Sequence, residues 1–273
     1  MRCAWKELLG ILPDTVRQEA DRYYRDTLQE VRLRLGKPAE LITTNGCCWL
    51  SNAVTSEDLQ FTVNMASRYS PWAAATVSKG YITAPGGHRI GLCGEAIVKD
   101  GRVHAVKNVT SLNIRIARDF SGIAHKIAFS GNLLIIGPPG SGKTTLLRDL
   151  ARQIARQKTV SVVDERGELF PMGFETGRMM DIMTGCGKPE GIEMALRTMG
   201  PEVIVVDEIT AEADCRALLN AGWCGVGLLA TAHASSSVDL RTREIYRPLM
   251  EMRVFDNLLV MLRDKSFRLE RMV

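Results

Sequence analysis

The second half of the chain alternates short apolar runs with segments of helical periodicity. The runs are rich in valine, isoleucine and leucine and occupy residues 133–136, 160–163, 203–206 and 227–231. Apolar residues at helical spacing mark residues 144–157, 191–199 and 211–221. Strands buried on both faces read as unbroken apolar runs, and helices between such strands connect them in parallel. The pattern predicts an α/β domain with a mainly parallel sheet, which a hairpin over residues 258–262 and 267–272 closes.

The first third of the chain has a mixed pattern. Residues 15–28 suit a helix, and residues 30–35 alternate charged and apolar positions as a half-buried strand does. Asn45-Gly46 predicts a hairpin turn, and Thr55 can cap a helix that runs to about residue 69. Residues 80–118 are strand-like. We therefore expect a smaller α+β domain over residues 1–122 and a larger domain over residues 123–273.

Composition places the chain among ordinary globular proteins, with 273 residues, 45% of them hydrophobic and 24% charged. The net charge of +4 lies in residues 1–125, which carry 16 Lys and Arg against 12 Asp and Glu, whereas residues 126–273 carry 19 of each. The excess positive charge of the first part can face an anionic partner or the phosphates of a neighbouring subunit.

Cysteines and hydropathy exclude several classes of protein. The seven cysteines include no Cys-x-x-Cys pair, which argues against a zinc knuckle or a thioredoxin-type site. An odd number without regular spacing suits a reducing compartment. The N-terminus lacks the apolar region of a signal peptide, and no apolar run approaches the roughly 20 residues of a membrane span. We expect a cytoplasmic protein whose contact with any membrane is peripheral.

A phosphate-binding loop follows the first apolar run of the second half. Residues 137–144 read Gly-x-x-x-x-Gly-Lys-Thr between a predicted strand and a predicted helix, which is the context that this motif requires. Its backbone N–H groups and the helix N-terminus attract phosphate, Lys143 reaches the β- and γ-phosphates, and Thr144 ligates Mg²⁺. The predicted ATP-binding residues are Gly137, Pro138, Pro139, Gly140, Ser141, Gly142, Lys143, Thr144 and Thr145.

Two strands end in the same sequence, Val-Val-Asp-Glu. Asp207 and Glu208 follow the longer apolar run, so we expect Asp207 to hold Mg²⁺ and Glu208 to activate the attacking water. Asp164 and Glu165 end the other strand and form a second acidic edge, in which Glu165 supports the metal or the water. Parallel sheets place their ligands at this edge.

Polar and basic residues supply further candidates. Thr231 and His233 end a third buried strand and could sense the γ-phosphate by hydrogen bonding. An arginine often stabilises that phosphate, and the candidates are Arg89, Arg115, Arg118 and Arg197. Arginines also recur every four residues on the helix that follows the loop, at 148, 152 and 156, which is typical of a solvated face. The guanine-reading motif Asn-Lys-x-Asp is missing, which favours ATP over GTP.

Together these segments resemble the type II and type IV secretion ATPase superfamily of P-loop motors. Residues 195–209 are similar to its arginine and Walker B block, residues 162–168 to its "Asp box", and residues 227–233 to its "His box". The resemblance implies a RecA-like fold, ATP hydrolysis with Mg²⁺, and catalytic roles for Glu208, Glu165, Lys143, His233 and Arg197. It also implies a homo-oligomer, with a hexamer expected as in the superfamily.

Three further segments resemble a sporulation branch of that superfamily. They are residues 30–38, 86–94 and 111–117, and they span much of the first half. This resemblance implies an ATPase that energises a membrane channel between mother cell and forespore, in peripheral contact with the channel's membrane proteins. The chain departs from the secretion motors at Asp207, where they usually have glycine, and in the absence of their tetracysteine module.

Two other functions are compatible with the same motifs. A nucleic-acid-dependent ATPase could use the basic first part, although the chain has only 6% aromatic residues with which to stack bases. A scaffold could bind nucleotide without hydrolysing it. Nucleic acid is not the partner that we expect.

Overall fold

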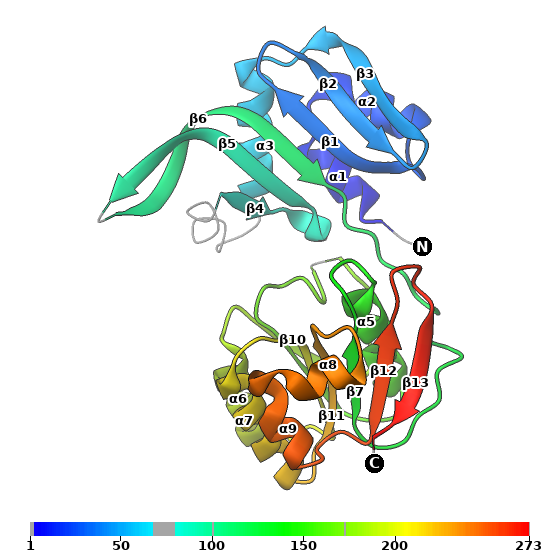
Figure 1. The fold of residues 1–273 in the computed structure, drawn as a ribbon. Coiled ribbons are helices and arrows are strands. Elements are labelled where there is room, and N and C mark those ends of the chain that lie inside the picture. Colours follow the sequence, from blue (N-terminus) through cyan, green and yellow to red (C-terminus); the bar gives the residue numbers. More distant parts are fainter. Residues whose placement is uncertain (1–2, 68–79, 100, 172, 273) are drawn as a thin grey trace. The chain divides into compact units, whose positions relative to one another are not determined.

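The computed structural model describes residues 3–67, 80–99, 101–171 and 173–272. The chain forms two compact units (Figure 1). The first comprises Met1–Asp119 together with Pro171–Phe174, and the second comprises Phe120–Phe170 and Glu175–Val273. The domain boundary proposed from the sequence, between residues 122 and 123, stays a prediction.

The first unit contains an antiparallel sheet of six strands in the order β3-β2-β1-β6-β5-β4. Its strands are β1 (Leu28–Arg34), β2 (Pro38–Thr43), β3 (Gly46–Ala53), β4 (Tyr81–Thr83), β5 (Arg89–Lys99) and β6 (Arg102–Arg115). Within its described residues, three helices and one short 3₁₀ helix accompany the sheet: α1 (Trp5–Ile11), α2 (Asp14–Tyr23), α3 (Ser56–Ser67) and η1 (Pro85–Gly87).

Alternation along β1 builds the core of this unit. Val31 and Leu33 are fully buried and pair with Leu41, Ile114 and Leu112 on the neighbouring strands. The predicted helix over residues 15–28 was too long, because α2 ends at Tyr23 and Leu28 already pairs within the sheet.

Local signals in the first unit were partly correct. Thr55 caps α3 as predicted: the Asp58 backbone N–H donates to Thr55 Oγ1 over 3.1 Å, and the Asp58 carboxylate accepts the Thr55 N–H over 2.9 Å. The predicted end of this helix, at about residue 69, lies outside the described residues. The hairpin turn differs by one residue, because Thr43 pairs with Gly46.

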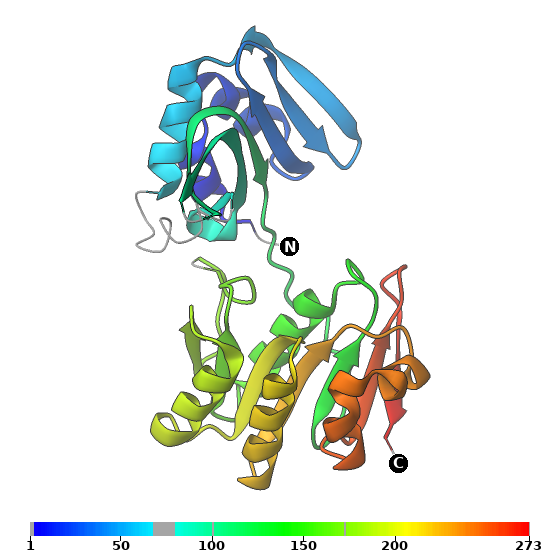
Figure 2. The same ribbon diagram turned by 60° about the vertical axis from the view of Figure 1, so that its left-hand side comes forward.

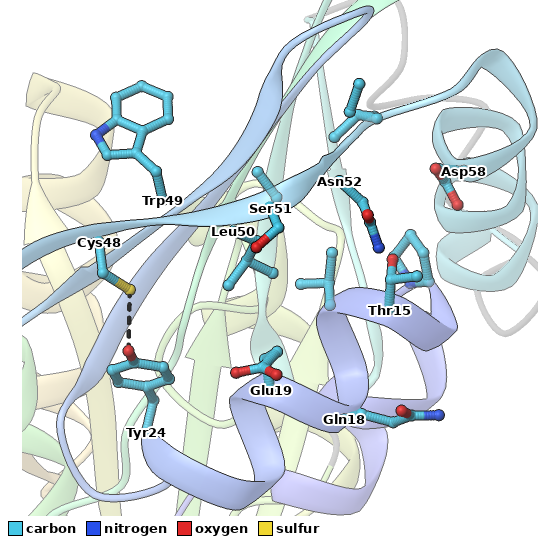
Figure 3. Close-up of a pocket in the computed structure, with 15 residues that line it drawn as sticks. Thr15, Gln18, Glu19, Tyr24, Cys48, Trp49, Leu50, Ser51, Asn52 and Asp58 are labelled. Carbon is cyan, nitrogen blue, oxygen red and sulfur yellow. Dashed lines mark hydrogen bonds between the residues drawn. The ribbon is translucent and has the colours of Figure 1, made fainter.

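A cleft of about 320 Å³ lies between the edge strand β3 and helix α2 (Figure 3). Cys48 and Leu50 face the helix, and Glu19 reaches toward them from α2. The Cys48 thiol donates a hydrogen bond to the Tyr24 hydroxyl over 3.2 Å at one end of the cleft. This bond joins the edge strand to the chain that follows α2.

The second unit is built on a seven-stranded sheet in the order β13-β12-β7-β11-β10-β8-β9. All neighbours are parallel except β12 and β13, which form the predicted closing hairpin. The strands are β7 (Leu133–Ile136), β8 (Val160–Asp164), β9 (Met180–Thr184), β10 (Val203–Ile209), β11 (Gly227–Ala232), β12 (Asn257–Met261) and β13 (Phe267–Arg271). The connecting helices are α5 (Lys143–Ile154), α6 (Lys188–Thr198), α7 (Glu212–Trp223), α8 (Ser237–Thr242), η2 (Glu244–Tyr246) and α9 (Arg247–Glu251).

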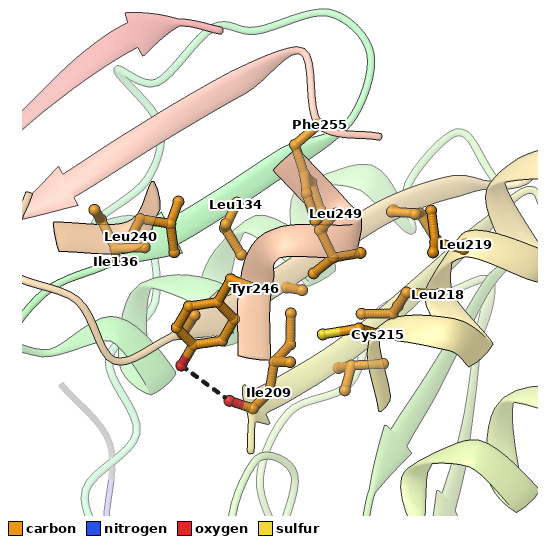
Figure 4. Packing of buried hydrophobic residues seen from close by; sticks show 14 of the residues in the cluster. Leu134, Ile136, Ile209, Cys215, Leu218, Leu219, Leu240, Tyr246, Leu249 and Phe255 are labelled. Carbon is orange, nitrogen blue, oxygen red and sulfur yellow. Dashed lines mark hydrogen bonds between the residues drawn. The ribbon is translucent and has the colours of Figure 1, made fainter. Parts of the chain in front are cut away.

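Helices cover both faces of this sheet (Figure 2). Successive residues of β7 face opposite sides, because strand side chains alternate. Leu134 packs in a buried cluster with Leu218, Leu249 and Phe255 (Figure 4), whereas Leu133 belongs to the cluster that contains Leu147 of α5. The continuous apolar runs of the sequence therefore mark strands buried on both faces, as predicted.

None of the helices in the described part of the chain is long and apolar enough to cross a membrane.

Candidate functional site

The phosphate-binding loop joins the end of β7 to the start of α5. Gly142 precedes the helix with a left-handed φ of 98°, a conformation that a residue with a side chain rarely adopts. A Cβ on Gly137 would lie 2.7 Å from the Met261 carbonyl oxygen and 2.8 Å from Ser141 Oγ. The loop thus requires glycine at both positions, and its backbone leads directly into a helix N-terminus.

Lys143 is the first residue of α5 and is only 7% exposed. Its ammonium donates to the carbonyl oxygens of Gly137 and Pro138 over 2.8 and 3.0 Å, so it lies over its own loop. Burial lowers the pKa of Lys143, and the charges of Asp207 and Glu208 act in the opposite direction. The structure therefore brings the predicted phosphate-binding lysine next to the predicted acidic pair.

Asp207 connects three segments of the second unit. Its carboxylate accepts a hydrogen bond from Thr144 Oγ1 over 2.8 Å and another from Thr231 Oγ1 over 2.6 Å. A hydroxyl and a carboxylate are the hard oxygen ligands that Mg²⁺ prefers when substrate phosphates and water complete its shell. This pair therefore suits a metal that arrives with phosphate.

Glu208 lies where β10 departs from regular pairing with β11. The register shifts between Val206 and Ile209, and Glu208 has a left-handed φ of 57°. Such a conformation costs about 1–3 kcal/mol in a residue with a side chain and occurs often at functional sites. The Glu208 N–H donates to Thr231 Oγ1 over 2.7 Å. Thr231 therefore holds both acidic residues, whereas its sequence context suggested a contact with phosphate.

His233 bridges the loop lysine and Glu208. Its Nδ1 lies 3.2 Å from the Lys143 ammonium, and its Nε2 lies 3.1 Å from Glu208 Oε1. Because an ammonium only donates, Nδ1 accepts and Nε2 carries the proton that it donates to the carboxylate. Arg166 approaches the other carboxylate oxygen of Glu208 at 3.4 Å. The predicted His233 thus joins the cluster through Glu208.

Asp164 and Glu165, which form the second acidic edge, make different contacts. Asp164 is buried and accepts backbone hydrogen bonds from Glu168, Leu169 and Phe170 over 2.8–3.0 Å. Burial raises the pKa of Asp164, these N–H groups oppose the shift, and the charge of Asp207 adds to it. Asp164 thus organises the loop after β8. The predicted Glu165 instead forms an ion pair, 2.6 Å long, with Lys188, a residue that the sequence did not single out.

The arginines of α5 correct one expectation. Arg148 and Arg152 are 6% and 7% exposed, so only Arg156 lies on a solvated face. Arg148 donates to the carbonyl oxygens of Leu169 and of Glu168, the latter over 3.0 Å. Backbone carbonyls of irregular loops lack hydrogen-bond partners within a strand or helix, and the Arg148 guanidinium donates hydrogen bonds to two of them. The four-residue spacing marked a loop-binding face of the helix.

Known proteins resemble this chain in both sequence and fold. The family model described as "Sporulation stage III, protein AA" matches residues 5–268. The chain belongs to this family. The Stage III sporulation protein AA of Bacillus subtilis (strain 168) is 38% identical over 282 residues, which cover 95% of this chain and 92% of that protein.

Two solved structures share the fold of this family member. The ATPase DotB of Legionella pneumophila has a TM-score of 0.60 at 16% identity and covers 95% of this chain and 81% of its own. The pilus retraction motor PilT, solved with ADP, has a TM-score of 0.65 at 15% identity. The match covers 90% of this chain and 76% of the PilT chain. The predicted class, a RecA-like domain with a mainly parallel sheet after an α+β region, is confirmed.

Arg197 lies apart from the cluster around Asp207 and Glu208, and the other three candidate arginines belong to the first unit. Arg197 pairs with Glu193 over 2.5 Å on the exposed side of α6. Within the first unit, Arg89 lies over the Tyr81 ring, Arg118 donates to the Leu28 carbonyl, and Arg115 is exposed on β6. A role for any of the four at a γ-phosphate stays a prediction.

Proposed function

We propose that this family member binds Mg-ATP at the loop of residues 137–145 and hydrolyses it to ADP and phosphate. The observation that carries the proposal is the convergence of Lys143, Thr144, Asp207, Glu208 and His233 at the carboxyl ends of β7, β10 and β11. Similarity to secretion and pilus ATPases and to a sporulation stage III protein supports an ATPase-like role in sporulation.

Each residue of the cluster has a distinct part in this proposal. The loop amides and Lys143 bind the phosphates, and Thr144 and Asp207 hold Mg²⁺. The metal supplies positive charge that offsets the charge developing on the phosphate oxygens. Glu208 accepts the proton of the attacking water, as a carboxylate close to the phosphate can. Thr231 keeps Asp207 and Glu208 at one edge of the sheet.

His233 links nucleotide binding to water activation in the same scheme. It contacts both the lysine that would bind the phosphate and the glutamate that would activate the water. A shift of the Lys143 ammonium from its loop carbonyls to a phosphate changes the hydrogen bond to His233 Nδ1, and the other ring nitrogen transmits that change to Glu208. Through His233, phosphate binding at Lys143 thereby affects Glu208, the proposed general base.

The working unit that we propose is a homo-oligomeric ring, with six subunits as its expected size. The ring contacts membrane proteins of a mother-cell-to-forespore channel from the cytoplasmic side. An arginine supplied by a neighbour, from Arg89, Arg115 or Arg118, completes the site. Glu165 and Arg197 keep the catalytic roles expected from the sequence, Glu165 in support of the metal or the water and Arg197 at the γ-phosphate.

Equilibrium binding of ATP, with and without Mg²⁺, tests the nucleotide site. Lys143→Ala removes charged hydrogen bonds and should weaken ATP binding by about tenfold to a hundredfold. Lys158→Ala, at an exposed lysine just after α5, should bind as the wild type does. Equal binding by all three proteins would contradict the proposed site.

Turnover and mass measurements separate the proposal from its two rivals. A nucleic-acid-dependent ATPase requires turnover that rises with single-stranded DNA or RNA and falls steeply with salt. A scaffold binds ATP without producing ADP under any condition. We expect turnover without nucleic acid, and a mass in solution well above 30.2 kDa when ATP is present.

A further inference from the structure

A buried lysine lies in an unfavourable position beside the site. Lys188 is the first residue of α6 and is only 5% exposed. A helix N-terminus carries partial positive charge and disfavours a cation, and burial of an ammonium is costly unless acidic partners compensate it. The buried Lys188 ammonium therefore needs acidic neighbours to offset the free-energy cost of its burial.

Two acidic residues from different segments of the second unit lie beside the ammonium. Glu165 Oε2, just after β8, lies 2.6 Å from Lys188 Nζ, and Asp214 Oδ2, in the first turn of α7, lies 4.0 Å from it. Asp214 is itself buried and accepts the backbone N–H groups of Thr210 and Ala211. Lys188 thus ties the loop after β8 to the start of α7, the segments that follow the two strands ending in acidic pairs.

The ion pair faces the candidate catalytic edge. Lys188 and Glu165 line a small hollow together with Asp207 and Glu208. The Glu165 side chain is 44% exposed, whereas that of Lys188 is only 6% exposed. A half-exposed glutamate samples several rotamers unless a fixed partner selects one. A buried lysine, held also by Asp214, is such a partner.

We propose that Lys188 is a positioning residue, which fixes the Glu165 carboxylate beside Asp207 and Glu208 so that Lys188 and Glu165 act as one unit in hydrolysis. The proposal rests on the ATPase function proposed above and adds a residue to it. The Lys188 ammonium does not contact nucleotide in this scheme. Its loss therefore lowers kcat and leaves ATP binding unchanged.

A double-mutant cycle in the full chain tests this coupling. Lys188→Met, Glu165→Gln and the double variant should each lower kcat by about tenfold to a hundredfold, the range found when the partner of a site residue is removed. The double variant should lose no more than either single variant, because Lys188→Met releases the same carboxylate that Glu165→Gln removes. The affinity for Mg-ATP should stay within about twofold of the wild type, as it should in Glu190→Gln, the matched control on the exposed side of α6.

Lys188→Arg keeps the positive charge and provides a second variant in case Lys188→Met does not fold. It should retain more activity than Lys188→Met, and adding Glu165→Gln should remove that advantage. Losses of kcat that multiply in the double variant would overturn the proposal, as would an unchanged kcat in Glu165→Gln. A parallel change in ATP affinity would assign Lys188 to binding instead.

Urea unfolding of the nucleotide-free proteins supplies a readout that needs no turnover. If the ion pair holds Glu165, Glu165→Gln should shift the unfolding midpoint less in the Lys188→Met background than in the wild type. Equal shifts in both backgrounds would contradict the contact itself. A wild-type protein that shows this coupling and hydrolyses no ATP would contradict the ATPase function and leave the ion pair established, so the two failures are distinguishable.

Discussion

Thr144 donates a hydrogen bond of 2.8 Å to Asp207, a residue 63 positions further along the chain. The bond joins the end of the phosphate-binding loop to the end of β10, across the strand β11 that separates β7 from β10 in the sheet. Parallel connections bring the carboxyl ends of these strands to one edge. The relationship places a hydroxyl and a carboxylate where a metal bound to phosphate would need both.

Thr231→Val should damage this edge without touching the loop. The change removes a hydroxyl that donates to Asp207 and accepts from the Glu208 N–H, and a buried group left without its partner costs about 1–3 kcal/mol. Turnover should fall by about tenfold to a hundredfold, as happens when the partner of a metal ligand is removed. Steady-state assays at varied Mg²⁺ measure this effect. Thr231→Ser, which keeps the hydroxyl, is the control, and an equal loss in both variants would argue against the hydrogen bonds.

Arg148→Met should loosen the loop that follows β8. The buried guanidinium donates to two loop carbonyls, and the variant leaves both without this donor, at a cost of about 1–3 kcal/mol. Arg156→Met removes an exposed arginine from the same helix spacing and should have little effect. Urea unfolding, with limited proteolysis over residues 165–175, compares the two. Similar midpoints and cleavage rates would show that Arg148 does not hold the loop.

His88 should make the first unit less stable in mild acid. It is fully buried, accepts from the Ala117 N–H at Nδ1 and lies 3.1 Å from the Ala4 carbonyl at Nε2, so it is held neutral. Burial lowers the pKa of His88, the Ala4 contact and Glu7 oppose the shift, and Arg118 adds to it.

The sign of the pH effect follows from this lowered pKa. The unfolded chain takes up a proton below about pH 6.5, which the folded chain resists, so stability is present above that pH and is lost as pH falls toward the folded pKa. Each unit of pKa difference contributes about 1.4 kcal/mol. Thermal unfolding at pH 7.5 and 5.5, compared between the wild type and His88→Asn, should show a smaller loss in the variant. Equal losses would assign the pH dependence to other groups.

The sequence predicted the second unit well because its signals are local. Strands buried on both faces must be apolar throughout, and a phosphate-binding loop needs its glycines and lysine at fixed spacing, so both can be recognised without knowledge of distant contacts. The edge strand β9 was missed, because Met180–Thr184 is half exposed and includes polar residues.

Long-range contacts account for what the sequence did not predict. Arg148 has the same spacing and charge as the exposed Arg156, and only the path of the loop after β8 determines that the first is buried. Lys188 lies in a segment without a motif, and its partners are 23 and 26 residues away. Thr231 was noticed for its position at a strand end, but its contact with both acidic residues depends on the register shift in β10.

Hydrolysis by Glu208→Gln tests whether Glu208 is the base that activates water. We expect this variant to bind Mg-ATP as tightly as the wild type and to form ADP at least about a hundredfold more slowly, because the amide cannot accept the proton of the attacking water. Glu212→Gln, an exposed change on α7, should hydrolyse ATP at the wild-type rate. Single-turnover measurement of ADP formation decides the question: an unchanged rate in Glu208→Gln would show that Glu208 is not the base for ATP hydrolysis.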